Sequence, residues 1–539
     1  MGYRDEIDVV VVGAGHNGLV SACYLAQAGL RVEVVEASPT IGGMTATNPT
    51  LPGAPHHMIN EGSIQGSLWR ATSIKRDLSL DRYGLREFIL PATHAQVDPE
   101  GASLAIWCDP RKTADEIRRF SPHDAQAWLD MAADLDSAMD FVLPYMLSHP
   151  TRLSRDVLIA AIRKSPKALR HVDAIIRLMT ASHAEFIAER FDHPLTRGAL
   201  AAMPPFSWMT QDGTGWAMIY VGLLHRIGGV AMFAGGTGGL PKALRNHLID
   251  HGGHVRTSAP VEALTTRAGR VTGVRLDGGE EIEARAVLTA CSPKTTFAKL
   301  LPPGMLPEHL ARRAEHFPTR LTEGGSLKIN VALRGRLTMP RHNPKRSDGF
   351  DLRVPVLAWN TLEEHIAAWE AVVARRWPDP IPVIFTVPTA TDPSQAPEGQ
   401  DTAWIWSGIA PVRAHEPWDD VRDKIGQRVI DAASHYYDGI EELEISRSVL
   451  AAPDIEQRFN SPDGNIYHLD ALFQRFGPLR PALGFGGYRT AVPGLFLTGS
   501  GTHPSGGISG LPGQLAAHTV IRSLRRGNPI RSRLRSKFR

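Results

Sequence analysis

The stretch IDVVVVGAGHNGLVSACYLAQAGLRVEVVE, residues 7–36, decides the fold of this chain. Residues 7–12 are almost all Val and Ile, a run that predicts a strand buried in a parallel sheet. Residues 19–28 read as a helix that ends at Gly29, and residues 31–36 read as a second strand. A strand, a helix and another strand in this order predict an α/β fold that opens with a βαβ unit.

The turn between the first strand and the helix follows the pattern G-x-G-x-x-G. The first glycine allows the tight turn, the second lets a pyrophosphate approach the backbone, and the third lets helix and strand pack closely. The N-terminus of the helix then faces the phosphate charge. An acid at the end of the second strand can accept hydrogen bonds from a ribose hydroxyl. The predicted dinucleotide site comprises Gly13, Ala14, Gly15, His16, Asn17, Gly18, Glu36 and Ala37.

Features outside the first turn favour FAD over NAD as the dinucleotide. Gly42 and Gly43 follow the second strand, where many FAD proteins run the backbone past the diphosphate, and a second glycine-rich turn lies near the C-terminus. The glycine cluster at 235–239 fails as a second fingerprint, since Pro241 stands where the last glycine should be. With one full fingerprint, we expect dioxygen or a quinone, rather than NAD(P)H, as the second electron carrier.

Length and composition indicate a globular enzyme with more than one lobe. The chain has 539 residues, 42% hydrophobic and 21% charged, so it is too long for one compact core and too apolar for disorder. The net charge of +3 gives no argument for nucleic acid. Cys23, Cys108 and Cys291 lie too far apart in sequence for a disulfide framework or a zinc ribbon. We therefore predict no metal site and a cytoplasmic location.

The middle of the chain carries two features that each allow two interpretations. Residues 110–197 predict mainly helices, interrupted by a basic stretch that favours a solvated helix face over peripheral contact with an anionic membrane. A bulky apolar segment at 206–233 favours a core over a substrate tunnel. The basic residues are Arg152, Arg155, Arg163, Lys164, Lys167 and Arg170, and the bulky ones are Trp208, Met209, Trp216, Met218, Tyr220 and Met232.

Several blocks of the chain resemble the phytoene desaturase-like branch of the flavin amine-oxidase superfamily. This branch holds carotenoid desaturases, isomerases and a ketolase type, together with uncharacterised oxidoreductases. The matching blocks are residues 9–36 with Gly42-Gly43, NEGS at 60–63, GGTGGLPKAL at 235–244, SPDGNIYHLDALFQRFGPLRP at 461–481 and YRTAVPGLFLTGSGTHPSGGISGLPG at 488–513. Asn60 departs from the acid that this branch often has near the flavin ring.

The resemblance implies a discontinuous Rossmann-type FAD-binding domain and a substrate domain that combines a mixed sheet with helices. It also implies a helix N-terminus beneath the flavin N1–O2 edge, which stabilises the negative charge of reduced flavin. The residues it places are Gly62 and Ser63 near the ring, Val261 at the adenine, Gly499 and Ser500 near the ribityl and diphosphate, and Gly507, Ile508 and Ser509 at the start of the last helix.

We predict that the domains are assembled from separate segments. FAD-binding parts cover residues 1–75, 231–300 and 481–525, substrate regions cover 76–230 (with a helical cap) and 301–480, and a basic tail covers 526–539. Strands are predicted at 254–261, 271–276, 281–290 and 493–498, and the last helix at 515–524.

The resemblance implies an FAD-dependent oxidase or desaturase that removes a hydride from an apolar, isoprenoid-like substrate. A polar metabolite or amine as substrate, a redox-neutral flavin isomerase, and a non-catalytic lipid-binding protein similar to the Rab GDP-dissociation inhibitors are the alternatives. His503 is the candidate to polarise a substrate or tune the flavin, with a turn histidine as the alternative. His468 is a weaker candidate, and His225 with Arg226 either face a substrate cavity or mark a helix end.

Overall fold

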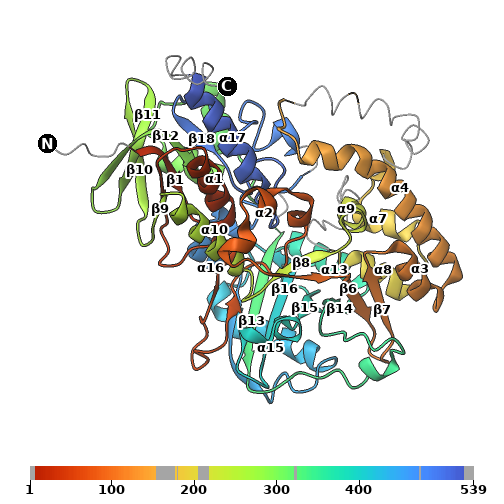
Figure 1. Cartoon of the computed structure of the whole chain (residues 1–539). Coiled ribbons are helices and arrows are strands. Elements are labelled where there is room, and N and C mark those ends of the chain that lie inside the picture. Colours follow the sequence, from red (N-terminus) through yellow and green to blue (C-terminus); the bar gives the residue numbers. More distant parts are fainter. Residues whose placement is uncertain are drawn as a thin grey trace.

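The computed structural model describes residues 7–152, 159, 176–178, 180–203, 218–320, 324–472 and 475–526. The molecule contains two sheets and a helical lobe (Figure 1). The N-terminal and C-terminal segments lie together in the lobe that contains β1 (Ile7–Val12) and α17 (Leu511–Arg526). Part of the predicted basic stretch and of the bulky apolar segment lies outside the described residues, as does the tail from residue 527: these include Arg155, Arg163, Lys164, Lys167, Arg170, Trp208, Met209 and Trp216.

The N-terminal βαβ unit lies inside a sheet whose other strands come from distant parts of the chain. Over the described residues this sheet has seven strands in the order β10-β11-β12-β1-β2-β9, with β18 paired to β12. The pairs that involve β1, β2, β9 and β18 are parallel, while the β10–β11 and β11–β12 pairs are antiparallel. The bounds are β1 Ile7–Val12, β2 Val32–Val35, β9 His254–Arg256, β10 Val261–Arg267, β11 Arg270–Leu276, β12 Glu281–Thr289 and β18 Leu495–Leu497.

The uncharged run of β1 is buried because both faces of this sheet are covered. Val9 and Val11 pack in one cluster with three helices, and Val10 packs in a second cluster with Val271 and Leu495 on the opposite face. Alternate residues of a strand point to opposite faces, so a strand covered on both sides needs apolar residues at every position. The three helices are α1 (His16–Gln27), α10 (Gly239–Asp250) and α17 (Leu511–Arg526).

Three sequence predictions in this lobe need correction. The strand predicted at 254–261 is confirmed only at its two ends, since β9 covers its first three residues and β10 begins at Val261. Pro260 cannot donate to a strand ladder and lies between the two strands. The rest of β10 was not predicted. The first and last helices begin earlier than predicted, at His16 and Leu511, because a helix can begin within a glycine turn and tolerates proline in its first turn. The last helix therefore begins after Ser509, and Gly507 to Ser509 form the turn before it.

The second sheet is mixed, as the resemblance implies, and is also assembled from separate segments. Its order over the described residues is β17-β13-β16-β15-β14-β6-β7. The β14–β6 pair is parallel and the other neighbours are antiparallel. The bounds are β6 Ala92–Val97, β7 Ser103–Trp107, β13 Gly324–Leu333, β14 Val356–Ala358, β15 Ile384–Thr386, β16 Asp401–Pro411 and β17 Glu444–Leu450. Helices α13 (Leu362–Val373), α15 (Trp418–Ser434) and α16 (Ala452–Phe459) accompany it.

A helical lobe lies beside the second sheet, where helices were predicted (Figure 1). It contains α3 (Pro110–Arg118), α4 (Pro122–Met146), α7 (His183–Ala188), α8 (Pro194–Ala201) and α9 (Ile219–Ile227). His225 packs edge-on against Trp128, and Arg226 forms ion pairs with Asp136 and Asp140. These two residues therefore mark the end of α9. No helix in the described part of the chain is long and apolar enough to cross a membrane.

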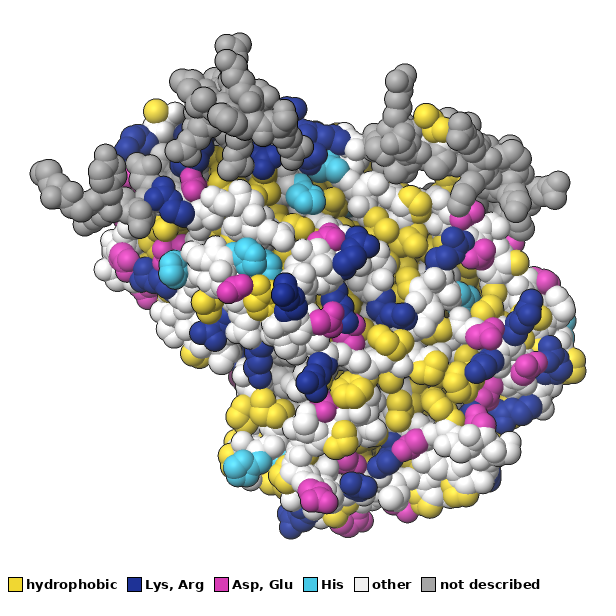
Figure 2. Space-filling model, in the orientation of Figure 1, with side chains coloured by type: hydrophobic (Ala, Val, Ile, Leu, Met, Phe, Trp, Pro, Cys, Tyr) yellow, Lys and Arg dark blue, Asp and Glu magenta, His cyan; other side chains and the backbone are white. Residues whose placement is uncertain are grey.

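The remaining helices and strands are short. Two strand pairs lie between the sheets, β3 (Thr47–Asn48) with β4 (Ile59–Asn60) and β5 (Glu87–Leu90) with β8 (Val230–Phe233). On the face shown in Figure 2, Lys and Arg side chains are interspersed with Asp and Glu over most of the described surface. This mixed surface agrees with the small net charge of +3.

Candidate active site

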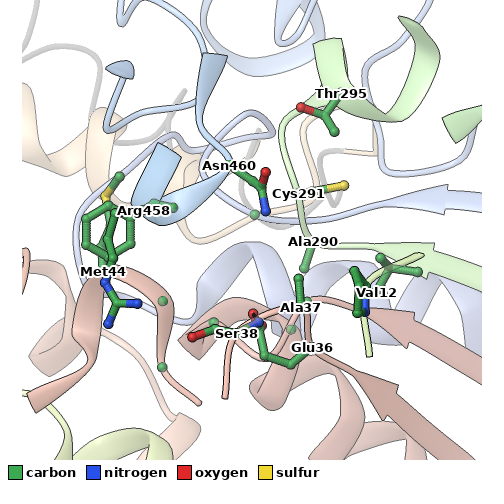
Figure 3. Close-up of a pocket in the computed structure, with 18 of the residues that line it drawn as sticks. Val12, Glu36, Ala37, Ser38, Met44, Ala290, Cys291, Thr295, Arg458 and Asn460 are labelled. Carbon is green, nitrogen blue, oxygen red and sulfur yellow. Dashed lines mark hydrogen bonds between the residues drawn. The ribbon is translucent and has the colours of Figure 1, made fainter. Parts of the chain in front are cut away.

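A cavity of about 850 Å³ lies at the carboxyl ends of β1, β2 and β12. Val12, Glu36 and Ala290, which end or follow these strands, line it, and Arg458 with Met44 lies at the other end (Figure 3). Ligands of open α/β sheets bind in the crevice outside the carboxyl ends of the strands. The cavity is therefore where the G-x-G-x-x-G turn places a dinucleotide.

The glycine turn has the geometry that a diphosphate requires. Gly13 has φ +103°, and a Cβ on Gly18 would lie 2.1 Å from the carbonyl oxygen of Gly13. Gly15 forms a backbone bridge with Gly42, and Gly43 lies against Gly15, so three glycines leave the backbone bare at the N-terminus of α1. That N-terminus has no side-chain cap and no acidic residue in its first turn. Its free N–H groups and helix dipole fit an anion.

Glu36 lies at the opposite side of this turn and orders it. Its Oε2 accepts the N–H of Ala14 at 2.7 Å, and its Oε1 accepts the N–H of Ser38 at 2.9 Å. A carboxylate has about four lone-pair sites, so these two bonds leave room for ribose hydroxyls. Ala37 and Val261 line the same cavity, as the cofactor prediction requires. Ala14 is fully buried and contributes its backbone to the turn rather than lining the cavity.

A second cavity of about 200 Å³ adjoins the first. Both are lined by the same six residues at their junction: His16, Met44, Leu450, Phe459, Ile466 and Ser500. The wall of the smaller cavity is mainly aromatic and aliphatic, and its aromatic side chains include Tyr220, Trp404, Trp406, Phe459 and Tyr467. Gly62, Ser63, Gly507 and Ile508 also line it, which agrees with their expected places near the flavin ring.

Lys328 is the cationic residue of the smaller cavity, and sequence analysis missed it. It lies on β13, is 3% exposed, and donates from Nζ to the carbonyl of Ile329 at 2.9 Å and to Oδ1 of Asn330. The Nζ atom is also 4.6 Å from the ring centroid of Trp404. Burial holds the pKa of Lys328 well below its usual value, because no carboxylate compensates the desolvation. The amine is therefore suited to exist in its neutral form.

The one carboxylate among the described residues of the smaller cavity is already neutralised. Oε2 of Glu61 accepts from Nε of Arg458 at 2.7 Å and also from its Nη2, and Oε1 of Glu61 accepts from Asn48. Arg458 comes from α16 and lines the larger cavity. Glu61 is 5% exposed, and a buried charge is stable when paired in this way. The pair joins the segment that follows β4 to α16.

Two histidines line the cavities as neutral rings. Burial lowers the pKa of His16 to about 4, and its Nε2 has no protein partner although it lies at the junction of the cavities. Burial likewise lowers the pKa of His468 to about 4, and His468 lines the larger cavity with an unpartnered Nδ1. His468, the weaker candidate from sequence, thus lies closer to the site than expected.

His503 does not reach either cavity over the described residues that line them. Its ring is 1% exposed, lies beside Tyr145 and Phe476, and has Nε2 at 3.1 Å from the carbonyl oxygen of Met146. Burial lowers its pKa to about 4. This packing favours the second interpretation offered by the sequence, a turn histidine, over a part in polarising a substrate.

Asn60 and the glycine cluster at 235–239 are linked by hydrogen bonds within the protein. Oδ1 of Asn60 accepts the N–H of Thr237 at 2.8 Å, and its Nδ2 donates to Gln395 at 2.7 Å. The N–H of Gly235 is bonded to Asp392, and the N–H of Gly238 is bonded to Thr47. These amides are occupied by protein side chains, which agrees with the prediction that this cluster is not a second nucleotide site.

The chemistry of this donor set fits a flavin dinucleotide, and family comparison gives the same result. A model described as flavin containing amine oxidoreductase matches residues 80–408, more than half of the chain. This chain belongs to the flavin-containing amine oxidoreductase family. A model of NAD(P)-binding Rossmann-like domains matches residues 11–64, which contain the βαβ unit. The chain is thus an FAD-dependent oxidoreductase with a Rossmann-like FAD-binding domain.

Relatives of this chain align over almost its whole length. The rat (Rattus norvegicus) pyridine nucleotide-disulfide oxidoreductase domain-containing protein 2 is 30% identical and is covered to 94%, with 97% of this chain aligned. A neurosporene-forming phytoene desaturase of Rhodobacter capsulatus is 24% identical over 95% of this chain and 93% of its own. The structure of cyclohexylamine oxidase from Brevibacterium oxydans has a TM-score of 0.58 at 18% identity, covering 96% of this chain and all of that one.

The structure brings most of the predicted cofactor residues together at the two cavities. Gly499 lines the larger cavity and Ser500 lines both. Ser509 is fully buried, and its Oγ accepts the N–H of Leu511 at 3.2 Å, so it serves the start of α17 and does not line either cavity. The side chains that sequence analysis missed are Lys328, Trp404, Trp406 and Arg458. A lysine inside the apolar strand SLKINVAL was the one available signal.

Proposed function

We propose that this chain is an oxidase or desaturase that takes a hydride from an apolar, isoprenoid-like organic substrate and passes the electrons to dioxygen or a quinone. The observation that carries the proposal is the smaller cavity, whose wall is mainly aromatic and aliphatic and which adjoins the dinucleotide cavity at His16 and Ser500. FAD, when bound, supplies the two-electron chemistry. An apolar pocket with few polar groups suits an apolar substrate.

Lys328 is a side chain in this cavity that can accept a proton. Desaturation removes a hydride and a proton from neighbouring carbon atoms, so a proton acceptor is needed beside the substrate. The lowered pKa of Lys328 favours the neutral amine, whose Nζ carries a free lone pair. Trp404 packs over that atom, and its own Nε1 donates to the carbonyl of Gly62 at 2.9 Å, which fixes the ring. The aromatic wall excludes water from the proton transfer.

The size of the smaller cavity limits what enters it. Its volume of about 200 Å³ is below the ~300–1,000 Å³ of pockets that enclose a drug-sized ligand. A small terpenoid-like substrate, or the reacting segment of a longer one, suits this space better than a whole carotenoid. A cationic amine is a poorer fit, since Glu61 is already paired with Arg458. The N–H groups of Gly235, Thr237 and Gly238 are bonded to protein side chains, which supports an acceptor other than NAD(P)H.

The test is anaerobic reduction of the purified yellow protein, followed by its flavin absorbance. Cyclic monoterpenes and short isoprenoid alkenes are expected to bleach the flavin, and primary amines of equal size are expected not to. Air or a soluble quinone should then restore the oxidised spectrum. Bleaching by amines alone would overturn the proposal. Double-bond migration without net bleaching, after prior reduction of the flavin, would identify an isomerase, and a protein that takes up no FAD would identify a lipid-binding relative.

A further inference from the structure

Arg480 is a fully buried arginine behind the wall of both cavities. It is 1% exposed and follows the C-terminal block at 461–479. Its guanidinium donates to backbone carbonyls: Nε and Nη2 to Ser500 at 3.1 and 2.8 Å, Nη1 to Asp470 at 3.1 Å, and Nη2 to Tyr467 and Leu469 at 3.0 and 3.1 Å. One cation therefore holds two segments together through their peptide oxygens.

This arrangement places a positive charge inside the protein. The hydrogen-bond partners of Arg480 are neutral carbonyls, whose dipoles solvate the cation without cancelling it. Burial lowers the pKa of Arg480 to about 9, so the guanidinium stays protonated at neutral pH. Asp470 lies near enough to raise the pKa of Arg480, and its Oδ1 accepts from Nδ2 of Asn465 at 2.7 Å. The carboxylate of Asp470 therefore opposes the effect of the guanidinium charge.

The carbonyls that Arg480 holds belong to residues that line the cavities. Ser500 lines both cavities, and Tyr467 lines the smaller one. His468, next to Tyr467, lines the larger cavity with φ +63°. A single peptide layer thus separates the guanidinium from the cavity surface at the junction of the two cavities. In this low-dielectric setting a charge acts strongly over such a distance.

We propose that Arg480 is a positioning residue that raises the reduction potential of the bound flavin. Two-electron reduction takes up two electrons and one proton and leaves one negative charge on the flavin, and a fixed cation behind the cavity wall stabilises that charge relative to the neutral oxidised form. Arg480 also holds the backbone of Ser500 and Tyr467 in place beside the cavities. The inference rests on FAD in the larger cavity and needs no particular substrate.

The experiment measures the flavin midpoint potential of the holoprotein with dithionite and reference dyes. Arg480→Met should lower the affinity for reduced flavin, relative to that for oxidised flavin, at least tenfold. For a two-electron couple this change lowers the midpoint potential by about 30 mV. Asp470→Asn keeps the bond to Asn465, removes the nearby negative charge, and should raise the potential. Arg267→Met is the control, because its exposed ion pair with Glu283 lies far out on the β10–β11 hairpin and should leave the potential unchanged.

Opposite shifts in the two variants are the result expected. A purely structural role would weaken FAD binding in both variants and leave their potentials equal to the wild-type value, which would overturn the inference. If Arg480→Met does not retain FAD, Asp470→Asn decides alone, and a potential that is unchanged or lowered refutes it. Dithionite reduces the flavin whatever the substrate, so a failed substrate screen leaves this measurement intact, while a wild-type protein without FAD refutes the cofactor assignment itself.

Discussion

The two cavities are built in different ways. The larger one is made mostly by backbone: Gly13, Gly15, Gly18, Gly42 and Gly43 form its phosphate end, and all of them lie within 31 consecutive residues. The smaller one is made by side chains that come from four or more separate segments of the chain. A backbone site depends on local conformation and can be read from a short stretch of sequence. A side-chain site depends on the tertiary fold and cannot be recognised in any short stretch of sequence.

The largest effect should come from the backbone site. Gly18→Ala puts a Cβ 2.1 Å from the carbonyl oxygen of Gly13, where neither strand nor helix can move, and should destabilise the protein by about 3 kcal/mol and abolish FAD binding. Thermal unfolding with flavin content measures both. Gly507→Ala, in open space, is a milder comparison, although its φ of +90° adds local strain. Normal flavin content in the Gly18 variant would contradict the assignment of this turn.

A substitution in the smaller cavity should change the rate of flavin reduction by substrate rather than the FAD content of the protein. Lys328→Met is expected to slow flavin reduction by substrate about 10²-fold or more, because a proton acceptor contributes ~10²–10⁴-fold. FAD should remain bound. Stopped-flow anaerobic reduction is the measurement, and Lys424→Met, an exposed lysine on α15, is the matched control. Equal loss of rate in both variants would remove Lys328 from the mechanism.

The same lysine gives a pH dependence with a defined sign. Between its lowered folded-state pKa and the ~10.4 of an unfolded lysine, the unfolded chain binds one more proton than the folded chain, so the free energy of unfolding rises with pH in that window. The rate of flavin reduction should also fall once pH drops below the folded-state pKa, where Nζ becomes protonated. Lys328→Met should lose both dependences, and a retained slope in denaturant titrations across this window would point to another group.

A subtler change tests whether the glycine cradle acts on the ligand alone. Gly15→Ala places its Cβ 3.9 Å from the nearest protein atom, at an ordinary φ of −64°, so the apoprotein should keep its stability within ~0.5 kcal/mol. The Cβ would instead face the diphosphate and should raise the FAD dissociation constant about tenfold, equal to ~1.4 kcal/mol. Fluorescence titration of the apoprotein measures this. A loss of stability equal to that of Gly18→Ala would show that the two glycines have one role.

The smallest effect is expected at His503. His503→Gln keeps a polar group near the carbonyl of Met146 and should cost about 1 kcal/mol of stability at most, with little change in the rate of flavin reduction. A rate that falls 10²-fold with FAD still bound would restore the catalytic interpretation of this histidine. The matched variant is His468→Gln, whose ring lines the larger cavity and should alter FAD affinity instead.

Much of the fold was predictable because its signals are local. The Val run of β1, the glycine turn and the apolar second strand specify a βαβ unit without any distant contact. β10 escaped prediction because Pro260 hides the boundary between two short strands, and its alternating burial is weak. Lys328 escaped because its burial arises only when β13 pairs with β16 and β17. Arg458 escaped because its partner Glu61 lies 397 residues earlier in the chain. His503 was overvalued because nearness in sequence to a flavin turn does not fix the direction of a side chain.

The position of β1 in its sheet also affects how the chain is made. Its neighbours are β2, which follows directly, and β12, whose first residue is 269 positions after Val12 (281 minus 12). At ~5–20 residues per second, a ribosome needs roughly 13–54 s to synthesise that interval. During this time one edge of an almost wholly apolar strand has no partner. The nascent chain therefore exposes a strand that a chaperone can bind before the FAD site is complete. The last residues that line the cavities, at 499–508, are synthesised only after most of both sheets.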